Sequence, residues 1–427
     1  MTYTEVLAYM FSQLPMYQRI GAAAYKADLN NTIQLLNLLG NPQHSFRSIH
    51  IAGTNGKGSV SHYLASIFQQ AGYKTALYTS PHLKDFRERI KINGIMIPKR
   101  EVSRFVDAHK TDFDEIQPSF FEMTAAMAFD YFRRQKVDIA IIETGMGGRL
   151  DSTNVIRPEI AVITNIGFDH TQFLGDTLEK IAVEKAGIIK PDIPIVIGES
   201  QMETQAVFSE VAVKLKARIY FAEESFSIKN IAEADFLSCD VYRDNKLYLK
   251  NLESELKGIY QLKNMLTVLQ TVEVLREIGF NLKEEDVRQG FANVVSTTAL
   301  LGRWQQLSEL PLVIADTAHN VAGLSISLNQ FCTLPHKDLR FVLGMVNDKD
   351  VKKTLSLFPA KAVYYFCKPD IPRGLDAATL ASEACQLDLI GKTYPTVKKA
   401  LQAAILEASA EDVIYVGGST FVVAEVV

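Results

Sequence analysis

Residues 53–59 read Gly-Thr-Asn-Gly-Lys-Gly-Ser and combine three glycines with one cation and one hydroxyl. Glycines at positions 53, 56 and 58 let the backbone approach an anion closely and adopt dihedral angles that other residues avoid. Lys57 can place an ammonium on the β- and γ-phosphates of a nucleotide, and the hydroxyl of Ser59 can bind Mg²⁺. These residue types at this spacing predict a phosphate-binding loop.

The general phosphate-loop pattern G-x-x-x-x-G-K-[ST] is not matched, because Gly58 separates Lys57 from Ser59. A glycine-rich turn that leaves its lysine in solvent is therefore an alternative. The surroundings favour phosphate binding, since an apolar run precedes the glycines and apolar side chains at helical spacing follow them. A helix that begins directly after the glycines would aim its free backbone amides at a bound phosphate.

Two strand-end side chains and one lysine are candidates for a metal site. Glu143 ends the apolar run 137–143, and His170 follows the apolar run 160–166. In a parallel sheet both would emerge at the edge that carries the phosphate loop, where a carboxylate can hold Mg²⁺. The alternatives are a solvated strand-end acid for Glu143 and a hydrogen-bonded surface or core histidine for His170. Lys185, taken alone, is typical of an exposed helix lysine.

The phosphate loop and later motifs together resemble the Mur ligase superfamily, specifically its folylpolyglutamate synthase and dihydrofolate synthase branch. The motifs are residues 53–59, the glycine-rich run 144–154, Glu-Lys-Ala-Gly at 184–187, Tyr-Gln-Leu-Lys-Asn at 260–264, Gly-Arg-Trp at 302–304 and Asp-Thr-Ala-His-Asn at 316–320. They occur in the family's order and span almost the whole chain. Leu301 departs from the family's usual proline before Gly-Arg, and residues 418–421 match its terminal loop only loosely.

This resemblance implies a role for each matching residue. The nucleotide would be bound by Gly53, Thr54, Asn55, Gly56, Lys57, Gly58, Ser59, Asn264, Arg303 and Asp316. Two Mg²⁺ ions would be held by Ser59, Glu143, His170 and a carbamylated Lys185, and the family's sites can also take K⁺. Lys57, Lys185, Arg303 and His319 would act in catalysis, and Thr79, Ser80, Pro81, His82, Asp151 and Ser419 would contact substrates. Without the resemblance, Asn264 would be interpreted as a helix-surface amide and Asp316 as a helix N-cap.

The implied reaction is an ATP-dependent ligation. ATP phosphorylates a pterin-linked carboxylate, and the amine of L-glutamate displaces phosphate from the resulting acyl phosphate. The acceptor is left open between dihydropteroate, folates that already carry glutamate, or both. Two alternatives remain: a cell-wall Mur-type amino-acid ligase, and an NTP-switched binding protein that would not need the set of Glu143, His170 and Lys185.

The pattern of apolar segments predicts an α/β protein with two domains. Apolar runs at 48–52, 74–79, 137–143, 160–166 and 193–197 alternate with helical patterns such as 4–14, 27–39 and 120–132, which predicts a doubly wound, mostly parallel sheet. A small antiparallel patch is expected at 226–256, helices near 261–278 and 283–292, and a linker at 294–299. Further strands near 312–316, 340–345, 362–367 and 413–416 predict a smaller Rossmann-like domain. We expect a Mur-ligase-type ATP-binding domain at 1–296 and a glutamate-ligase domain at 301–427.

Composition limits the classes of partner. A formal charge of −4, from 45 basic and 49 acidic residues, provides no general field for nucleic acid. The hydrophobic fraction of 47% and charged fraction of 22% are typical of a globular protein, and no membrane segment or leader is expected. Four widely spaced cysteines without a C-x-x-C pair suggest reduced thiols. We therefore expect a cytoplasmic monomer that acts on small molecules.

Overall fold

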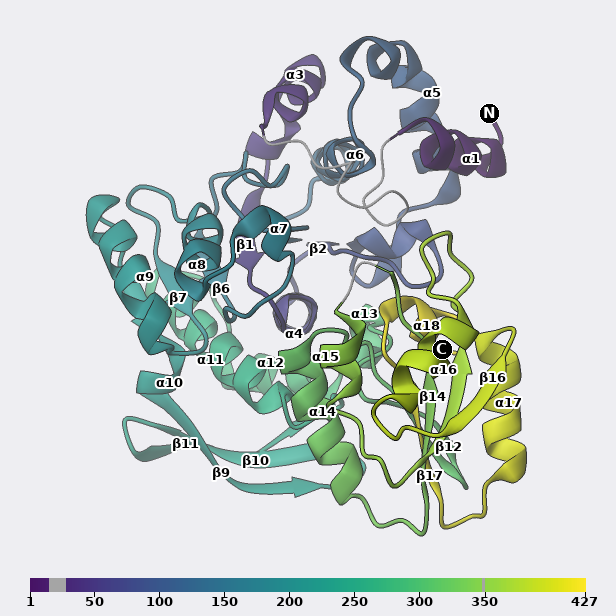
Figure 1. Cartoon of the computed structure of the whole chain (residues 1–427). Coiled ribbons are helices and arrows are strands. Elements are labelled where there is room, and N and C mark those ends of the chain that lie inside the picture. Colours follow the sequence, from purple (N-terminus) through teal and green to yellow (C-terminus); the bar gives the residue numbers. More distant parts are fainter. Residues whose placement is uncertain (15–27, 348–349) are drawn as a thin grey trace. The chain divides into compact units, whose positions relative to one another are not determined.

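A computed structural model describes residues 1–14, 28–347 and 350–427 (Figure 1). By their internal contacts these residues form two compact units. The first unit comprises Met1–Glu255 and Gln261–Ala299, and the second comprises Leu256–Tyr260 and Leu300–Val427. The segment Leu256–Tyr260 therefore groups with the second unit, which the expected division at 296–301 did not include.

The first unit is built on an eight-stranded sheet with the order β4-β3-β2-β5-β1-β6-β7-β8. Strands β2, β5, β1, β6, β7 and β8 are parallel, while β3 pairs antiparallel with β2 and the edge strand β4 pairs antiparallel with β3, so the predicted mostly parallel sheet is confirmed. Strands β1 and β5 are almost completely buried, as expected for apolar runs covered on both faces. The strands are β1 (Arg47–Ala52), β2 (Thr75–Tyr78), β3 (Ile90–Ile92), β4 (Ile95–Met96), β5 (Ile139–Glu143), β6 (Ile160–Ile163), β7 (Ile195–Ile197) and β8 (Ile219–Phe221).

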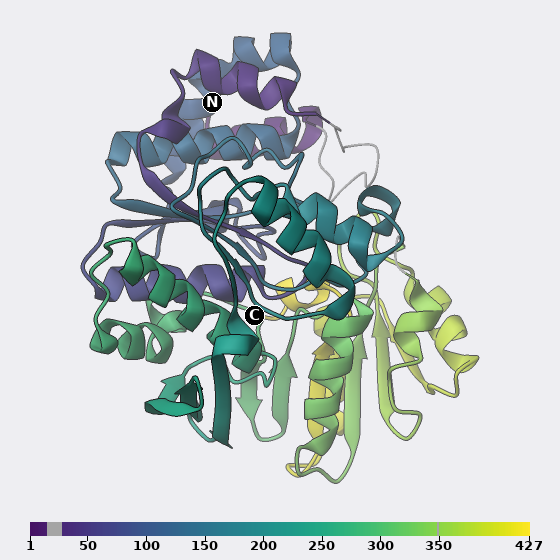
Figure 2. The same ribbon diagram turned by 90° about the vertical axis from the view of Figure 1, so that its left-hand side faces the viewer.

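Helices cover both faces of this sheet. Alternate strand residues such as Ala140 and Ile163 pack against α6, α8 and α9, while α4 and α11 lie on the opposite side, as Figures 1 and 2 show for α6 and α4. The helix after the phosphate loop, α4, is buried from Ser59 to Phe68, not only on the one face that its apolar spacing predicted. The helices are α1 (Tyr3–Gln13), α3 (Asn30–Leu38), α4 (Lys57–Gln70), α5 (Lys99–Ile116), α6 (Phe120–Gln135), α7 (Thr171–Leu174), α8 (Leu178–Ala186), α9 (Met202–Lys214), α10 (Ala222–Ser225), α11 (Gln261–Glu277), α12 (Glu284–Ala292) and α13 (Val294–Thr298), with 3-10 turns at Pro42–His44 and Phe86–Arg89. Residue 27, where one predicted helix began, lies outside the described residues.

A separate three-stranded antiparallel sheet completes the first unit. It consists of β9 (Phe226–Glu233), β10 (Leu237–Arg243) and β11 (Lys246–Ser254). This finding confirms the antiparallel patch predicted at 226–256. Alternate residues of β10 are buried, which is the pattern of a sheet with one solvated face.

The second unit contains a six-stranded sheet in the order β12-β13-β17-β14-β15-β16. Its central strands match the predicted apolar runs, and the parallel pairs β13–β17, β17–β14, β14–β15 and β15–β16 form most of the sheet. The polar edge strands β12 and β16 were not predicted. The elements are β12 (Gln305–Glu309), β13 (Leu312–Ala315), α14 (Val321–Thr333), β14 (Leu339–Leu343), α15 (Val351–Leu355), β15 (Val363–Cys367), α16 (Ala377–Cys385), β16 (Gly391–Tyr394), α17 (Val397–Glu407), β17 (Val413–Gly417) and α18 (Thr420–Ala424).

The expected linker at 294–299 is wrong in its conformation, because Val294–Thr298 form the short helix α13 within the first unit and Ala299 is its C-cap. Lys91 donates from Nζ to the carbonyl oxygens of Thr298 and Ala299, at 2.8 and 3.1 Å. The Thr298 hydroxyl also lies 2.7 Å from Nδ1 of His62 on α4. These distant partners hold a turn of helix that the local sequence does not indicate.

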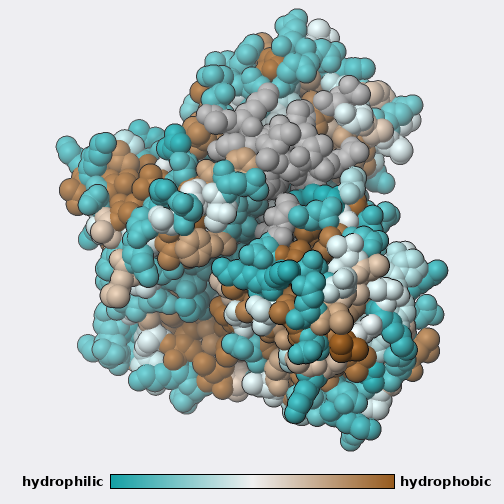
Figure 3. Space-filling model, in the orientation of Figure 1, coloured by the Kyte–Doolittle hydropathy of each residue, from teal (hydrophilic) through white to brown (hydrophobic). Residues whose placement is uncertain are grey.

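No helix among the described residues is long and apolar enough to span a membrane. On the face shown in Figure 3, hydrophobic residues (brown) are interspersed with hydrophilic ones (teal).

Candidate active site

The phosphate loop connects the end of β1 to the start of α4, in the order that the sequence predicts. Gly53 has φ +151° and Gly56 has φ +84°, which are backbone conformations that favour glycine. A Cβ atom on Gly53 would lie 1.9 Å from Oγ1 of Thr164, and one on Gly56 would lie 2.2 Å from Oδ1 of Asn264. Both glycines are therefore required by packing as well as by backbone geometry.

The loop that follows β6 holds the phosphate loop in place. The Thr54 hydroxyl donates to the carbonyl of Gly167 at 3.1 Å and lies 2.9 Å from the backbone amide of the same residue. The amide of Asn55 donates to Oδ1 of Asn165 at 2.9 Å. These contacts fix the positions of Thr54 and Asn55, so the phosphate loop is held by the residues that follow β6.

The N-terminus of α11 lies against the same loop. Gln261 donates from Nε2 to the hydroxyl oxygen of Ser59 at 3.1 Å, and Asn264 donates to Oε1 of Gln261 at 2.8 Å. Asn264 is buried beside Gly56 and is not the helix-surface amide of the alternative interpretation. The fold thus brings Asn264 to the phosphate loop although about two hundred residues separate them in the chain.

Two lysines converge on one carbonyl oxygen of the loop. Lys57 donates from Nζ to the carbonyls of Gly53 at 2.9 Å and Thr54 at 3.2 Å, and Lys185 donates from Nζ to the same Gly53 oxygen at 2.9 Å. Lys185 is buried, with a relative exposure of 3%, so it is not an exposed helix lysine. Burial and then the charge of Lys57 lower the pKa of Lys185 to about 7, against the opposing effect of nearby carboxylates. A substantial fraction of this amine is neutral near pH 7.

The strand-end carboxylate Glu143 lies beside the loop predicted to contact substrate. It is buried at the end of β5, where it pairs in register with Ile51 of β1, and its Oε2 accepts a hydrogen bond from the amide of Ser80 at 3.1 Å. Burial excludes the alternative of a solvated acid. In the same loop, Nδ1 of His82 accepts from Nε of Arg89, at the end of the following 3-10 turn, at 2.7 Å. Burial, followed by the charge of Arg89, lowers the pKa of His82 to about 3.

His170 lies at the start of α7 with a left-handed backbone, φ +51°. Its Nε2 is 4.0 Å from a carboxylate oxygen of Asp169 and its ring is partly exposed. No group of three or more His, Cys, Asp or Glu side chains among the described residues is arranged to hold a metal. The oxygen atoms of Ser59 and Glu143 are of the kind Mg²⁺ prefers, and a carbamylated lysine would add another. The predicted metal set is compatible with Mg²⁺ on the chemistry of its donors.

The carboxylate of Asp151 holds the glycine-rich loop that follows β5. It accepts from the amides of Gly145 at 2.8 Å, Met146 at 2.9 Å and Thr153 at 3.0 Å, and from the hydroxyl of Thr153 at 2.5 Å. Since that hydroxyl donates to Asp151, it must accept from Nε2 of His50, 2.8 Å away and fully buried in β1. His50 thereby connects the sheet to this loop, a role that its sequence position does not signal.

In the second unit, the motif at 316–320 follows β13. Asp316 is buried and accepts hydrogen bonds from its own unit, and Asn320, not Asp316, is the N-cap of α14. Arg303 donates from its guanidinium to the hydroxyl of Thr317, and Nδ1 of His319 lies 3.0 Å from the carbonyl of Thr317. The motif therefore gathers three of the four predicted residues of this unit, Arg303, Asp316 and His319, around one turn.

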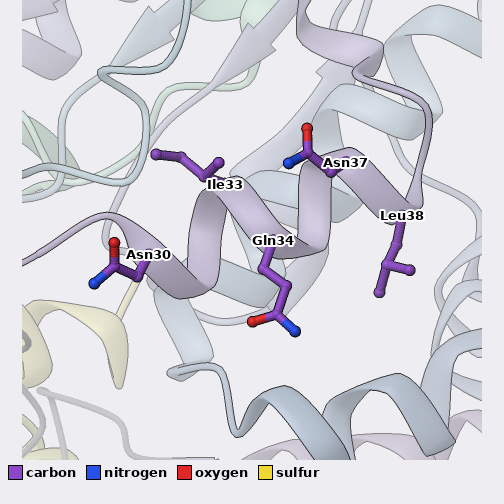
Figure 4. Close-up of a pocket in the computed structure, with 5 residues that line it drawn as sticks. All are labelled: Asn30, Ile33, Gln34, Asn37 and Leu38. Atoms are coloured by element: carbon purple, nitrogen blue, oxygen red, sulfur yellow. The ribbon is translucent and has the colours of Figure 1, made fainter.

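Ser419 follows β17, whose Gly417 lies against Asp316. The Ser419 hydroxyl caps α18 by accepting from the amide of Val422 at 3.3 Å. A pocket of about 430 Å³ lies along α3, lined by Asn30, Ile33, Gln34, Asn37 and Leu38 (Figure 4). None of the predicted site residues lines it.

Comparison with known proteins identifies the family. A family model described as the Mur ligase middle domain matches residues 51–272, and one described as the Mur ligase, glutamate ligase domain matches residues 302–420. The folylpolyglutamate synthase of Lacticaseibacillus casei is 34% identical over 88% of each chain. The dihydrofolate synthase/folylpolyglutamate synthase of Escherichia coli K12 is 33% identical over 88% of this chain and 85% of that protein.

Solved structures agree with these relatives. Escherichia coli FolC in complex with DHPP and ADP superposes with a TM-score of 0.87 at 30% identity and covers 100% of this chain and 97% of that one. A bifunctional folylpolyglutamate synthase/dihydrofolate synthase from Yersinia pestis, complexed with AMPPNP and a Mn ion, has a TM-score of 0.84 at 28% identity over 100% and 97% of the two chains. The chain therefore belongs to the folylpolyglutamate synthase and dihydrofolate synthase family of ATP-dependent ligases, within the Mur ligase superfamily.

Proposed function

We propose that this chain joins L-glutamate to the carboxylate of a pterin-linked substrate through an acyl phosphate formed from ATP. The main support for the proposal is that Lys57 and Lys185 both donate to the carbonyl oxygen of Gly53, in a glycine loop that is followed directly by a buried helix. The relatives support the substrate class, since they include both folylpolyglutamate synthases and dihydrofolate synthases.

The positive groups of the loop suit the transfer of a phosphoryl group. Attack by a carboxylate on the γ-phosphorus brings two anions together, so the transition state needs fixed positive charge and hydrogen-bond donors. Lys57 and the amides at the start of α4 provide these in the first unit, and Arg303 provides a guanidinium in the second. In this proposal Asn264 contacts the adenine, Asp316 the ribose, and His319 lies near the reacting groups.

A divalent cation supplies further charge neutralisation when bound. Ser59, Glu143, His170 and Lys185 would hold it, and a Yersinia pestis relative was solved with AMPPNP and a Mn ion. An unmodified Lys185 ammonium would repel such a cation. We therefore include carbamylation of Lys185 in the proposal: the neutral amine attacks the carbon of CO₂ and loses one proton to water, which leaves an anionic N-carboxylate. The lowered pKa of Lys185, about 7, supplies the neutral amine that this step needs.

The acceptor and glutamate contacts are proposed from the loops that surround these groups. The loop from Thr79 to His82 adjoins Glu143 and would contact the pterin-linked acceptor. Asp151 would contribute indirectly by holding the neighbouring loop, because four donors of that loop already fill the acceptor positions of its carboxylate. Ser419 would contact the incoming glutamate, an amino acid that is bound in one solved relative. Dihydropteroate and folates that already carry glutamate are both candidate acceptors.

The test is ADP formation with each component omitted in turn. With ATP, Mg²⁺, L-glutamate and an acceptor present, we expect ADP and a new amide in equal amounts. Dihydropteroate and a reduced folate monoglutamate, assayed separately, identify the acceptor. ADP release that does not depend on glutamate or on either acceptor would contradict the ligase proposal and favour an NTP-switched protein.

A further inference from the structure

Tyr260 is the first residue of the motif at 260–264, which also contains Asn264, yet none of the proposed roles accounts for this tyrosine. Its hydroxyl donates to Oδ2 of Asp316 at 2.6 Å. Tyr260 ends the segment Leu256–Tyr260, which groups with the second unit although the residues on both sides of it belong to the first. The contact with Asp316 therefore lies inside one compact unit.

The hydrogen bonds to Asp316 leave one acceptor position. The amide of Trp304 also donates to Oδ2, at 2.9 Å, and the amide of Ala318 donates to Oδ1 at 2.7 Å. An ionised carboxylate has about four lone-pair positions, two on each oxygen. Oδ2 is therefore saturated by Tyr260 and Trp304, and the remaining position lies on Oδ1.

The segment that carries Tyr260 is itself fixed. The amide of Ile259 donates to Oε1 of Gln330 at 2.7 Å, and Nε2 of Gln330 donates to the carbonyl of Lys257 at 3.2 Å. Gln330 lies on α14, the helix that the Asp316 motif opens. The ring of Tyr260 packs closely on Gly258, where an added Cβ would lie 2.6 Å from the ring. The phenol is thus held in one orientation by its own unit.

We propose that Tyr260 is a positioning residue for nucleotide binding, which fixes the Asp316 carboxylate so that Oδ1 alone receives a ribose hydroxyl. This inference rests on the proposed contact of Asp316 with the ribose. Without the phenol, Oδ2 would regain a lone pair and the carboxylate could rotate, so the hydroxyl would be bound with poorer geometry. Tyr260 acts through Asp316 and does not itself touch the nucleotide.

The position of Tyr260 in the chain adds a second consequence. The next residue, Gln261, belongs to the first unit and donates to the hydroxyl of Ser59. Two consecutive residues therefore each bond to one predicted nucleotide-site residue: Tyr260 to Asp316 in the second unit, and Gln261 to Ser59 in the first. A change at Tyr260 is expected to raise the KM for ATP and to leave the KM for glutamate unchanged.

The variant Tyr260→Phe removes only the hydroxyl. We expect the KM for ATP to rise by about five- to tenfold with kcat within about twofold, the size expected for one hydrogen bond that supports a charged group. The preference for ATP over 2′-deoxy-ATP or 3′-deoxy-ATP, whichever the wild type discriminates, should fall by a similar factor. Tyr415→Phe is the matched control, because it removes another buried phenol of the same unit, one that contacts Ser327 at 3.2 Å.

The pH dependence supplies a readout that loss of packing would not mimic. Burial raises the pKa of Asp316, whereas the hydrogen bond from Tyr260, the two backbone amides and the charge of Arg303 lower it. Tyr415 is a further titratable group near this carboxyl among the described residues, and burial keeps its phenol neutral by raising its pKa. Removing the Tyr260 hydrogen bond should raise the pKa of Asp316, so the acidic limb of the ATP-binding profile should move to higher pH in Tyr260→Phe and stay in place in Tyr415→Phe.

Two further variants separate the possible failures. If Asp316→Asn leaves ATP binding and sugar preference unchanged, the proposed ribose contact is wrong and this inference falls with it. If Asp316→Asn impairs both while Tyr260→Phe matches the wild type, only the inference is overturned. Gly258→Ala, which displaces the ring and keeps the hydroxyl, should show a KM increase in the same direction even if Tyr260→Phe folds poorly. A wild-type KM and sugar preference in a folded Gly258→Ala protein would contradict the proposal.

Discussion

Replacing Lys185 by methionine should change how the stability of the protein depends on pH. Methionine has a similar shape but no charge, and the Gly53 carbonyl keeps its hydrogen bond from Lys57. The pKa of Lys185 falls from its ordinary 10.5 to about 7 in the folded chain, so between these values the unfolded chain binds more protons. The stability of the wild type should therefore rise with pH relative to Lys185→Met.

The size of this effect follows from the two pKa values. The ammonium costs the wild type about 5 kcal/mol at low pH, and the cost vanishes above the ordinary pKa. Between pH 8 and pH 10 the free energy of unfolding of the wild type should gain about 2.5 kcal/mol over that of the variant. At pH 7 and below, Lys185→Met should be the more stable protein.

Urea unfolding of both proteins from pH 6 to pH 10, in metal-free buffer purged of CO₂ and followed by circular dichroism, measures this difference. Trp304 is the single tryptophan and lies in the second unit, so its fluorescence serves as an internal reference. Adding bicarbonate should extend the pH-dependent difference below pH 7, because a carbamylated folded chain binds no proton at this nitrogen whereas the amine of the unfolded chain still does. Parallel stability curves of the two proteins in CO₂-free buffer would show that Lys185 has an ordinary pKa and would refute the reasoning.

Three further changes test the rest of the site. Lys57→Ala should lower kcat by about a hundred- to a thousandfold with little change in melting temperature, since its charge is needed mainly in the transition state; near-normal turnover in steady-state assays would rule out its proposed role. Gly56→Ala should weaken ATP binding measured by calorimetry, because its φ of +84° and the close approach of Asn264 leave no room for a Cβ; unchanged affinity would count against the loop geometry. His50→Leu should lower the free energy of unfolding by about 1–2 kcal/mol by leaving Thr153 without its donor, and a variant as stable as the wild type would show that this hydrogen bond is not needed.

The strands that form the centre of each sheet were predictable because each is an uninterrupted apolar run. Residues 139–143 and 160–163 are buried on both faces of the first sheet, which requires apolar side chains at every position. Edge strands have no such requirement. Strand β12 (Gln305–Glu309) is polar and partly exposed, so no pattern in the sequence distinguishes it from a loop.

The short helix α13 shows a different limit of sequence interpretation. Residues 294–299 have weak helix-forming side chains and no helical period, and the sequence alone indicates a linker. The helix exists because Lys91, over two hundred residues earlier, donates to its terminal carbonyls and because His62 contacts the hydroxyl of Thr298. Such long-range hydrogen bonds cannot be predicted from the sequence of the helix itself.

The glycine loop, its order between strand and helix, and the family were predictable from the chain alone, because glycine spacing and motif order are local properties. Which side chains meet depends on folding. It placed Lys57 and Lys185 on one carbonyl and set Asn264 beside Gly56. It also gave His50, Arg89 and Tyr260 their partners. Lys57 and Arg89 bond to groups a few residues away, whereas the other residues act through a hydrogen bond to a group remote in the chain or through burial. Remote contacts and burial depend on distances that exist only after folding.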